Sequence, residues 1–128
     1  MNFPEDLLYT KEHEWVRVEG NTATVGITDF AQNELGDIVY VDIEDSAVEE
    51  SFDREDVFGS VEAVKTVSDL YMPVAGQILE VNEKLADTPE LVNEDPYGEG
   101  WMIRIKLEES PADAGLMSAK AYEDRVAA

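Results

Sequence analysis

Short segments in which apolar and polar residues alternate constrain the fold of this chain more than any other feature. The segments are rich in β-branched side chains and are bounded by turn residues, which is the pattern of half-buried strands in a mainly β protein. They lie at residues 15–19, 22–27, 37–43, 57–61, 67–72, 76–81 and 101–107, with a weaker one around residues 48–52. The chain has 128 residues, the length of one domain, so we predict a single domain over residues 1–128.

A short internal echo indicates how these strands are arranged. Residues 36–41, Gly-Asp-Ile-Val-Tyr-Val, are echoed by residues 76–81, Gly-Gln-Ile-Leu-Glu-Val, at the level of Gly-x-Ile-aliphatic-x-Val. Two similar units in an all-strand pattern are typical of a sandwich or a flattened barrel. We therefore predict such a fold, built from two related hairpin units.

Cap residues predict short helices between the strands. Asp29 followed by Gln32 has the pattern of a capping box, and it predicts a helix over residues 30–35 that ends at Gly36. A second short helix is predicted to begin at residues 88–89, where a threonine precedes a proline.

The end of the sequence predicts one more helix. Ser118 is a suitable first cap, and the helix would extend over about residues 118–127. Apolar residues could form a stripe along it that packs on the strands, namely Leu116, Met117, Tyr122 and Val126.

Charge and composition exclude several functional classes. Thirty acidic residues against nine basic ones give a net charge of −21, which repels nucleic acid and anionic membranes. This charge either keeps the chain soluble or steers it onto partners with basic docking surfaces. No apolar run approaches the roughly 20 residues of a membrane span, and the first residues lack the pattern of a secretory signal, so a cytoplasmic location is expected.

Catalytic residues are hard to find in this sequence. There is no cysteine, so disulfides and thiolate chemistry are excluded, and any redox chemistry must come from a cofactor. His13 is the only histidine, and a lone histidine more often has a structural hydrogen-bonding role than a catalytic one. No metal site is predicted.

Lys65 is the one conspicuous side chain. It is the only basic residue between Arg54 and Lys84, and it lies at the turn of a predicted hairpin within residues 57–81. The turn is unusual because residues 60–69 contain no Gly, Pro or Asn. Taken alone, Lys65 is best interpreted as a solubilising lysine of an edge strand, and less readily as an amine presented to a modifying enzyme.

The surrounding residues resemble the H-protein family of the glycine cleavage system. In that family a lysine within Glu-Ser-Val-Lys-Ala/Thr carries lipoic acid in amide linkage, and residues 62–66 read Glu-Ala-Val-Lys-Thr here. Further blocks resemble the family in the same order, at residues 13–16, 26–32, 35–41, 91–93 and 96–103. The resemblance covers nearly the whole chain and implies a barrel-sandwich like that of biotinyl and lipoyl carriers.

The resemblance implies a monomeric carrier and not an enzyme. A lipoate-attaching enzyme would modify Lys65, with Glu62, Val64 and Thr66 as its recognition residues. The lipoyl arm would receive an aminomethyl group from a pyridoxal-phosphate glycine decarboxylase and pass it to a tetrahydrofolate-dependent aminomethyltransferase. Dihydrolipoamide dehydrogenase would then reoxidise the arm.

The family's loaded arm is thought to rest in a surface cleft lined by acidic residues. The matching positions here are Glu12, Glu14, Glu34 and Asp69. Glu12 stands where some members have a small hydroxyl residue, and Glu34 stands where some have histidine. In this interpretation the carboxylates hold the protonated amine of the cargo.

Three other classes of protein compete with this interpretation. A biotinyl carrier normally has methionines on both sides of its lysine, where this chain has Val64 and Thr66. The lipoyl domains of 2-oxoacid dehydrogenases usually carry Asp directly before the lysine. An acidic interaction module without a cofactor would leave Lys65 unmodified.

Overall fold

The computed structural model describes residues 1–127, so the last residue of the expected domain lies outside the described part. The strands are β1 (Leu8–Tyr9), β2 (Glu14–Glu19), β3 (Thr22–Ile27), β4 (Ile38–Asp42), β5 (Ser51–Phe52), β6 (Val57–Ala63), β7 (Val67–Tyr71), β8 (Gly76–Val81) and β9 (Ile103–Leu107). The α-helices are α1 (Asp29–Leu35), α2 (Lys84–Asp87), α3 (Leu91–Glu94) and α4 (Ala119–Ala127). Two 3-10 helices, η1 (Asp45–Ala47) and η2 (Pro111–Asp113), complete the regular structure of the described chain.

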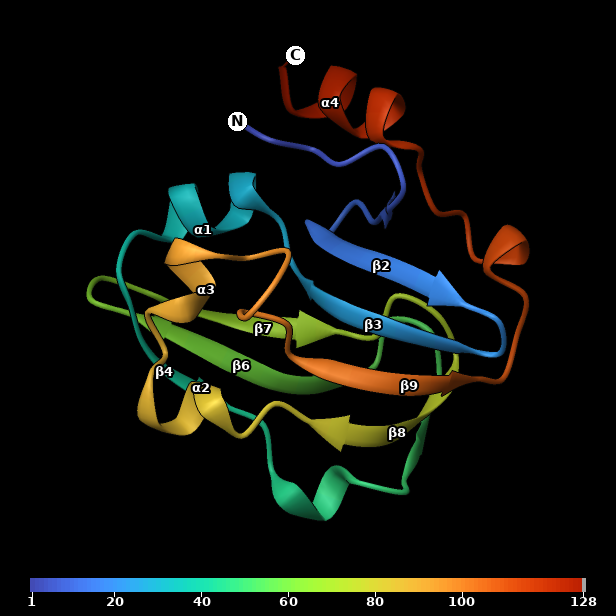
Figure 1. Cartoon of the computed structure of the whole chain (residues 1–128), viewed down its shortest axis with the longest axis horizontal. Helices are drawn as coiled ribbons and strands as arrows, with labels where there is room; N and C mark the ends of the chain where they lie inside the picture. Colours follow the sequence, from blue (N-terminus) through green and yellow to red (C-terminus); the bar gives the residue numbers. More distant parts are fainter. Residues whose placement is uncertain (128) are drawn as a thin grey trace.

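The strands form two antiparallel sheets that face each other (Figure 1). One has six strands in the order β1-β2-β3-β9-β8-β5, and the other has three in the order β4-β6-β7. Buried side chains from both sheets form one hydrophobic core between them, including Val25, Ile105 and Ile78 from the large sheet and Val61 and Leu70 from the small one. The predicted mainly β sandwich with short helices and a C-terminal helix is confirmed, although the described strands do not close into a barrel.

The two echoed segments lie in different sheets. Residues 36–41 lead into β4 of the small sheet, whereas residues 76–81 are β8 of the large sheet. The expected hairpin segment of residues 57–81 is divided in the same way, because β6 pairs with β7 while β8 pairs with β9. The alternation in sequence predicted these strands, and their assignment to sheets came from tertiary packing.

Two predicted helix starts are wrong by a short distance. The N-cap of α1 is Thr28, whose hydroxyl accepts a hydrogen bond from the Ala31 N–H at 3.1 Å, while Asp29 is the first helical residue. Thr88 does not begin a helix, because it is the C-terminal cap of α2, and α3 follows it. Thr28 and Asp29 both suit an N-cap, so local preference does not choose between them, whereas α3 begins after Glu90, which makes no capping side-chain hydrogen bond.

Helix α4 covers a second, smaller cluster of buried side chains. The cluster contains Leu7, Tyr9, Trp15, Ala119 and Tyr122. The helix begins after Ser118, whose hydroxyl accepts a hydrogen bond from the Ala121 N–H at 3.2 Å. Of the expected apolar stripe, only Tyr122 and Val126 lie on the helix, since Leu116 and Met117 precede it. The first residues of the chain and α4 lie at the same end of the molecule (Figure 1).

Gly26 lies where β3 passes close to the Trp15 side chain, so a substitution there tests the packing. A Cβ atom at Gly26 would lie 2.8 Å from the Trp15 indole, which is fully buried and donates from Nε1 to the Pro96 carbonyl oxygen at 2.9 Å. We expect Gly26→Ala to lower the free energy of unfolding by about 1–3 kcal/mol, because the ring must shift to make room. Urea denaturation followed by tryptophan fluorescence measures this, and an unchanged midpoint would contradict the close contact.

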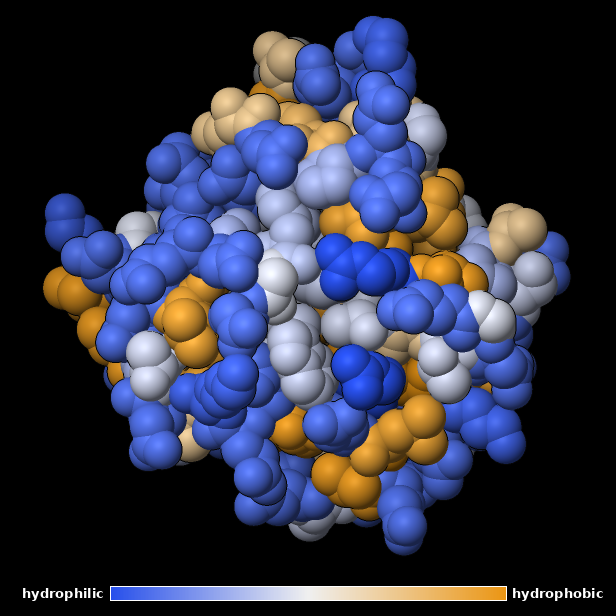
Figure 2. Space-filling view, viewed as in Figure 1, coloured by the Kyte–Doolittle hydropathy of each residue, from blue (hydrophilic) through white to orange (hydrophobic). Residues whose placement is uncertain are grey.

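Hydrophilic side chains cover much of the face seen in Figure 2, and apolar side chains gather there only in separate small patches. Within residues 1–127, no helix has the length and apolar character needed to cross a lipid bilayer.

Candidate functional site

Lys65 lies at the tip of the β6–β7 hairpin, and its side chain is exposed. The hairpin is antiparallel, with Glu62 opposite Val67, and its turn is closed by a hydrogen bond of 2.8 Å from the Ala63 N–H to the Thr66 carbonyl oxygen. None of the ion pairs between described residues involves Lys65. Its amine is therefore presented to solvent at the end of a well-defined hairpin.

The backbone of this turn explains its unusual sequence. In the described chain, the only residues other than glycine with positive φ are His13, Glu49 and Glu55, so the Lys65 turn contains none. A turn without positive φ has no need of Gly or Asn. The absence of turn residues around Lys65 is thus compatible with a tight hairpin.

The predicted recognition residues surround Lys65 on the surface. Val64 is 71% exposed, and Glu62 and Thr66 are also exposed. Glu62 is the middle member of a row across the small sheet, because it pairs with Tyr40 on β4 and with Val67 on β7. Tyr40 and Val67 are 51% and 60% exposed, so this row combines one carboxylate with two exposed apolar side chains.

The four predicted cleft residues line one cavity. Glu12, Glu14, Glu34 and Asp69 come from the turn before β2, from β2 itself, from α1 and from β7, and the cleft between them has a volume of about 270 Å³. The cleft thus brings these four residues together, although they lie up to 57 positions apart in the sequence. Apolar side chains complete the cleft, among them Ile27, Phe30, Leu35 and Leu70.

Glu14 differs from the other three acidic residues because it is only 2% exposed. One carboxyl oxygen, Oε2, accepts a hydrogen bond of 2.7 Å from the Tyr71 N–H, and Oε1 accepts one of 3.3 Å from the Thr10 hydroxyl. Burial raises the pKa of Glu14 to about 8, and these hydrogen bonds oppose the rise without cancelling it. Glu14 therefore joins β2 to the end of β7 as a mostly neutral group near pH 7.

Glu12, Glu34 and Asp69 are exposed at the cleft. Exposed carboxyl groups keep most of their contact with water and can be reached by a ligand. Acidic groups at the rim and apolar groups inside suit a molecule with an apolar stem and a cationic end. The acidic groups that such a molecule can reach are thus these three residues and not Glu14, which is buried.

His13 also lines the cleft, and the sequence had indicated only a structural hydrogen-bonding role for it. Its φ is +69°, its ring centroid lies 4.9 Å from that of Phe30, and its Nδ1 lies 2.9 Å from the Tyr122 hydroxyl. Burial lowers the pKa of His13, although nearby Glu12 opposes the change. No sequence signal identified His13 as a cleft residue, because its place depends on the contact with α4.

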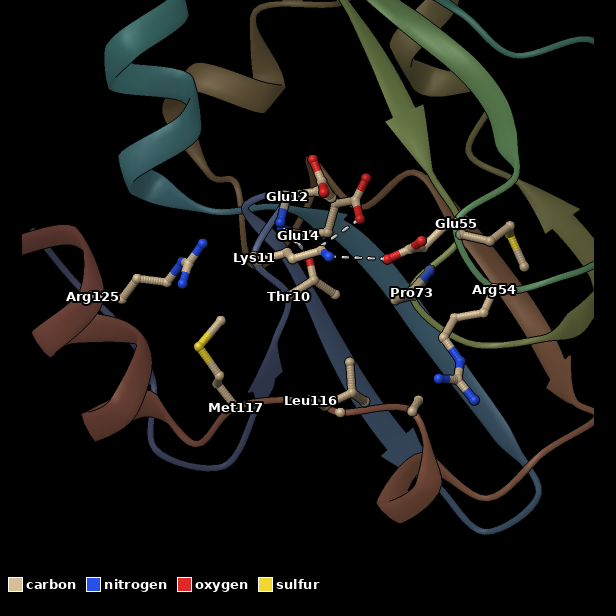
Figure 3. A pocket seen from close by; sticks show the side chains of 13 residues that line it. Thr10, Lys11, Glu12, Glu14, Arg54, Glu55, Pro73, Leu116, Met117 and Arg125 are labelled. Atoms are coloured by element: carbon tan, nitrogen blue, oxygen red, sulfur yellow. Dashed lines mark hydrogen bonds and ion pairs between the residues drawn. The ribbon is translucent and has the colours of Figure 1, made fainter.

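A second cavity of about 370 Å³ shares Glu12 and Glu14 with the cleft (Figure 3). Three basic residues line it, but Lys11 pairs with Glu55 at 3.4 Å and Arg54 pairs with Glu109 at 2.5 Å. Arg125 approaches from α4 on the opposite side to Arg54 (Figure 3). Within the described residues no cluster of three His, Asp or Glu side chains suits a metal ion.

Comparison with known proteins gives one consistent result. The sequence profile of the family described as Glycine cleavage H-protein matches residues 7–128. The chain is 57% identical over 123 residues to a glycine cleavage system H protein of Bacteroides thetaiotaomicron, with 96% of each chain covered. It is also 57% identical over 124 residues to that of Salinibacter ruber, covering 97% of this chain and 98% of the relative.

A solved structure agrees with the sequence relatives. The crystal structure of a glycine cleavage system H protein from Mycobacterium marinum superposes with a TM-score of 0.88 and 36% sequence identity, covering 98% of this chain and 99% of that one. The resemblance inferred from the sequence blocks is confirmed over nearly the whole length. The chain therefore belongs to the glycine cleavage H-protein family.

Proposed function

We propose that this chain is a non-catalytic carrier that holds lipoic acid in amide linkage on Lys65. It would carry the aminomethyl group of glycine from a pyridoxal-phosphate glycine decarboxylase to a tetrahydrofolate-dependent aminomethyltransferase. Dihydrolipoamide dehydrogenase would complete the cycle by reoxidation. The observation that carries this proposal is Lys65, which is exposed at a hairpin tip and forms no ion pair within residues 1–127, in a chain of this family.

The residues at the tip fit such a group. Lys65 has no competing ion pair among the described residues, and the turn around it is exposed, so an attaching enzyme can reach the amine. Lipoic acid supplies a dithiolane, which the chain cannot replace because it has no cysteine. Glu62, Val64 and Thr66 are proposed as the residues that the lipoate-attaching enzyme reads.

The cleft is proposed as the resting place of the loaded arm. Glu12, Glu34 and Asp69 would hold a cationic amine at the rim through charge-assisted hydrogen bonds. Apolar side chains such as Phe30 and Leu35 would limit the access of water. Glu14 contributes by fixing the position of β7, since its carboxyl group already accepts the Tyr71 N–H.

The charge of the chain fits a shuttle with several partners. A net charge of −21 favours fast encounters with enzymes that carry basic docking surfaces and disfavours nucleic acid and anionic lipid. We propose that it works in the cytoplasm as a monomer. A single tethered arm then meets each partner at a high effective concentration.

The proposal is tested by intact mass. Incubation with a lipoate ligase, lipoate and ATP should add one lipoyl group to the wild-type chain. The lipoylated protein, with its dithiolane in the oxidised disulfide form, should then gain one aminomethyl group when glycine and the decarboxylase are supplied. Glycine loses its carboxyl group as carbon dioxide, one sulfur takes the aminomethyl group and the other becomes a thiol. A chain that gains no lipoyl group would overturn the carrier function and favour an acidic interaction module without a cofactor.

A further inference from the structure

The hydroxyl of Tyr122 connects two walls of the cleft from behind. Tyr122 lies on α4, far from Lys65 in sequence, and its side chain is fully buried. Its hydroxyl oxygen lies 2.9 Å from His13 Nδ1 and 2.8 Å from the Thr28 hydroxyl. The two partners lie in separate segments of the chain, on either side of the β2–β3 hairpin.

Both partners are connected to the walls of the cleft. His13 lines it directly and contacts Phe30, which also lines it. Thr28 is the N-cap of α1, and that helix forms one cleft wall with Phe30, Ala31, Glu34 and Leu35. The Tyr122 hydroxyl thus joins the turn that carries Glu12 to the start of the helix that carries Glu34.

The position of Tyr122 is set independently of the cleft. Its ring stacks on that of Tyr9, with ring centroids 4.8 Å apart and an interplanar angle of 7°. It also packs against the Phe3 ring in a T-shaped arrangement, with ring centroids 5.3 Å apart. The backbone of Met117, just before α4, exchanges hydrogen bonds of 2.9 and 2.7 Å with Tyr9. Helix α4 is therefore a fixed support from which one hydroxyl reaches the cleft.

We propose that Tyr122 is a positioning residue, and that α4 holds the arm cleft in its closed shape through the Tyr122 hydroxyl. This inference rests on the proposed function, because it concerns the shelter of the loaded arm. Without the hydroxyl, the His13 turn and the start of α1 lose their common side-chain partner and keep only their direct backbone bond, from the Thr28 N–H to the His13 carbonyl oxygen at 3.0 Å. The cleft then opens more often, and water reaches the cargo sooner.

The hydrogen-bond chain also has a spectroscopic signature. The Tyr122 hydroxyl has one proton, so it donates either to His13 Nδ1 or to Thr28, and it accepts from the other. The two arrangements differ in whether Nδ1 carries a proton, and in either one the loss of the hydroxyl changes the surroundings of that nitrogen. His13 is the only histidine of the chain, so its ring nitrogen signals in an NMR spectrum report this contact without overlap.

The test compares Tyr122→Phe with Tyr9→Phe in the lipoylated full-length protein. Both variants remove one tyrosine hydroxyl from the same aromatic cluster, but the Tyr9 hydroxyl donates to the Pro4 carbonyl oxygen at 2.6 Å and does not reach the cleft. Tyr122→Phe removes both hydrogen bonds of this hydroxyl, but opening the wild-type cleft needs to break only one of them. The loaded form is therefore expected to lose its aminomethyl group between about two and ten times faster in Tyr122→Phe. The Tyr9→Phe rate should equal that of the wild type. The His13 nitrogen signals should move in the first variant only.

Three results would overturn the inference. One is an unchanged lifetime of the loaded form in Tyr122→Phe, and another is an equal loss in Tyr9→Phe, which would show a general effect of stability. The third is an unmoved His13 signal. If Tyr122→Phe does not fold, His13→Asn removes the same link from the cleft side, keeps a residue that tolerates positive φ, and should shorten the lifetime likewise. A wild-type chain that takes no lipoyl group would instead refute the proposed function itself.

Discussion

The variant Lys65→Arg is expected to gain no lipoyl group under conditions in which the wild-type chain gains one. Attachment needs a primary amine that can lose its proton and attack an activated carboxyl group. The arginine guanidinium stays protonated and delocalised, so it keeps the positive charge at the hairpin tip but cannot form the amide. The expected loss is complete, and intact mass measures it directly.

Lys120→Arg is the matched control. The Lys120 side chain is 81% exposed on α4, so it tests whether exposure alone permits attachment. This variant should gain one lipoyl group as the wild type does. Retention of the gain in Lys65→Arg, or its loss in Lys120→Arg, would contradict the assignment of Lys65.

The second large effect is on the pH dependence of stability. Burial raises the pKa of Glu14 to about 8 in the folded chain, whereas the ordinary value is 4.5. Below pH 4.5 the Glu14 carboxyl group is protonated in both the folded and the unfolded chain, and its contribution to the free energy of unfolding is fully present. As pH rises toward 8, the unfolded chain releases this proton first, so stability is lost; above about pH 8 no further loss occurs. The difference between the two pKa values corresponds to roughly 5 kcal/mol in total, of which about 4 kcal/mol is reached at pH 8.

Glu14→Gln should remove this part of the pH dependence. The amide oxygen can still accept the Tyr71 N–H, and the amide nitrogen would donate to the Thr10 hydroxyl oxygen, which reverses the hydrogen bond that Oε1 accepts in the wild type. The variant and the wild type should have similar free energies of unfolding at pH 4.5, and the variant should be more stable at pH 8 by up to about 4 kcal/mol. Urea denaturation across this pH range measures both.

The exposed neighbour Glu12 provides the control for general charge repulsion. Glu12→Gln removes one charge from the same turn, but its side chain is exposed, so its curve should run nearly parallel to that of the wild type. Parallel curves for the wild type and Glu14→Gln would show that the buried carboxyl does not titrate as inferred.

Much of the fold follows from local pattern. The alternation around Val16 and around Ile105 predicted strands because a strand with one buried face has a period of two, and both segments are strands here. The caps of α1 and of the segment after Thr88 were placed one or more residues away. Thr28 and Asp29 both suit an N-cap, and only the hydrogen bond to Ala31 in the folded chain distinguishes them.

The candidate site, too, was predictable only in part from the sequence. Lys65 was found because a single basic side chain stood within matching sequence blocks, and its exposure at the hairpin tip agrees with that role. The burial of Glu14 was not predictable, because a glutamate is seldom buried without a partner and the partner here lies 57 residues away. Its carboxyl group is enclosed only when β7 brings Tyr71 alongside.

The sequence by itself determined the strand periods, the family and the position of the amine, since these depend on residue types at short spacing. Tertiary structure decided which strands share a sheet, that burial raises the pKa of Glu14, and that Tyr122 meets His13 across 109 residues. The physical reason is that hydrogen bonding and desolvation depend on the atoms around a side chain. Those atoms come from distant segments, whose proximity is set by strand pairing and core packing.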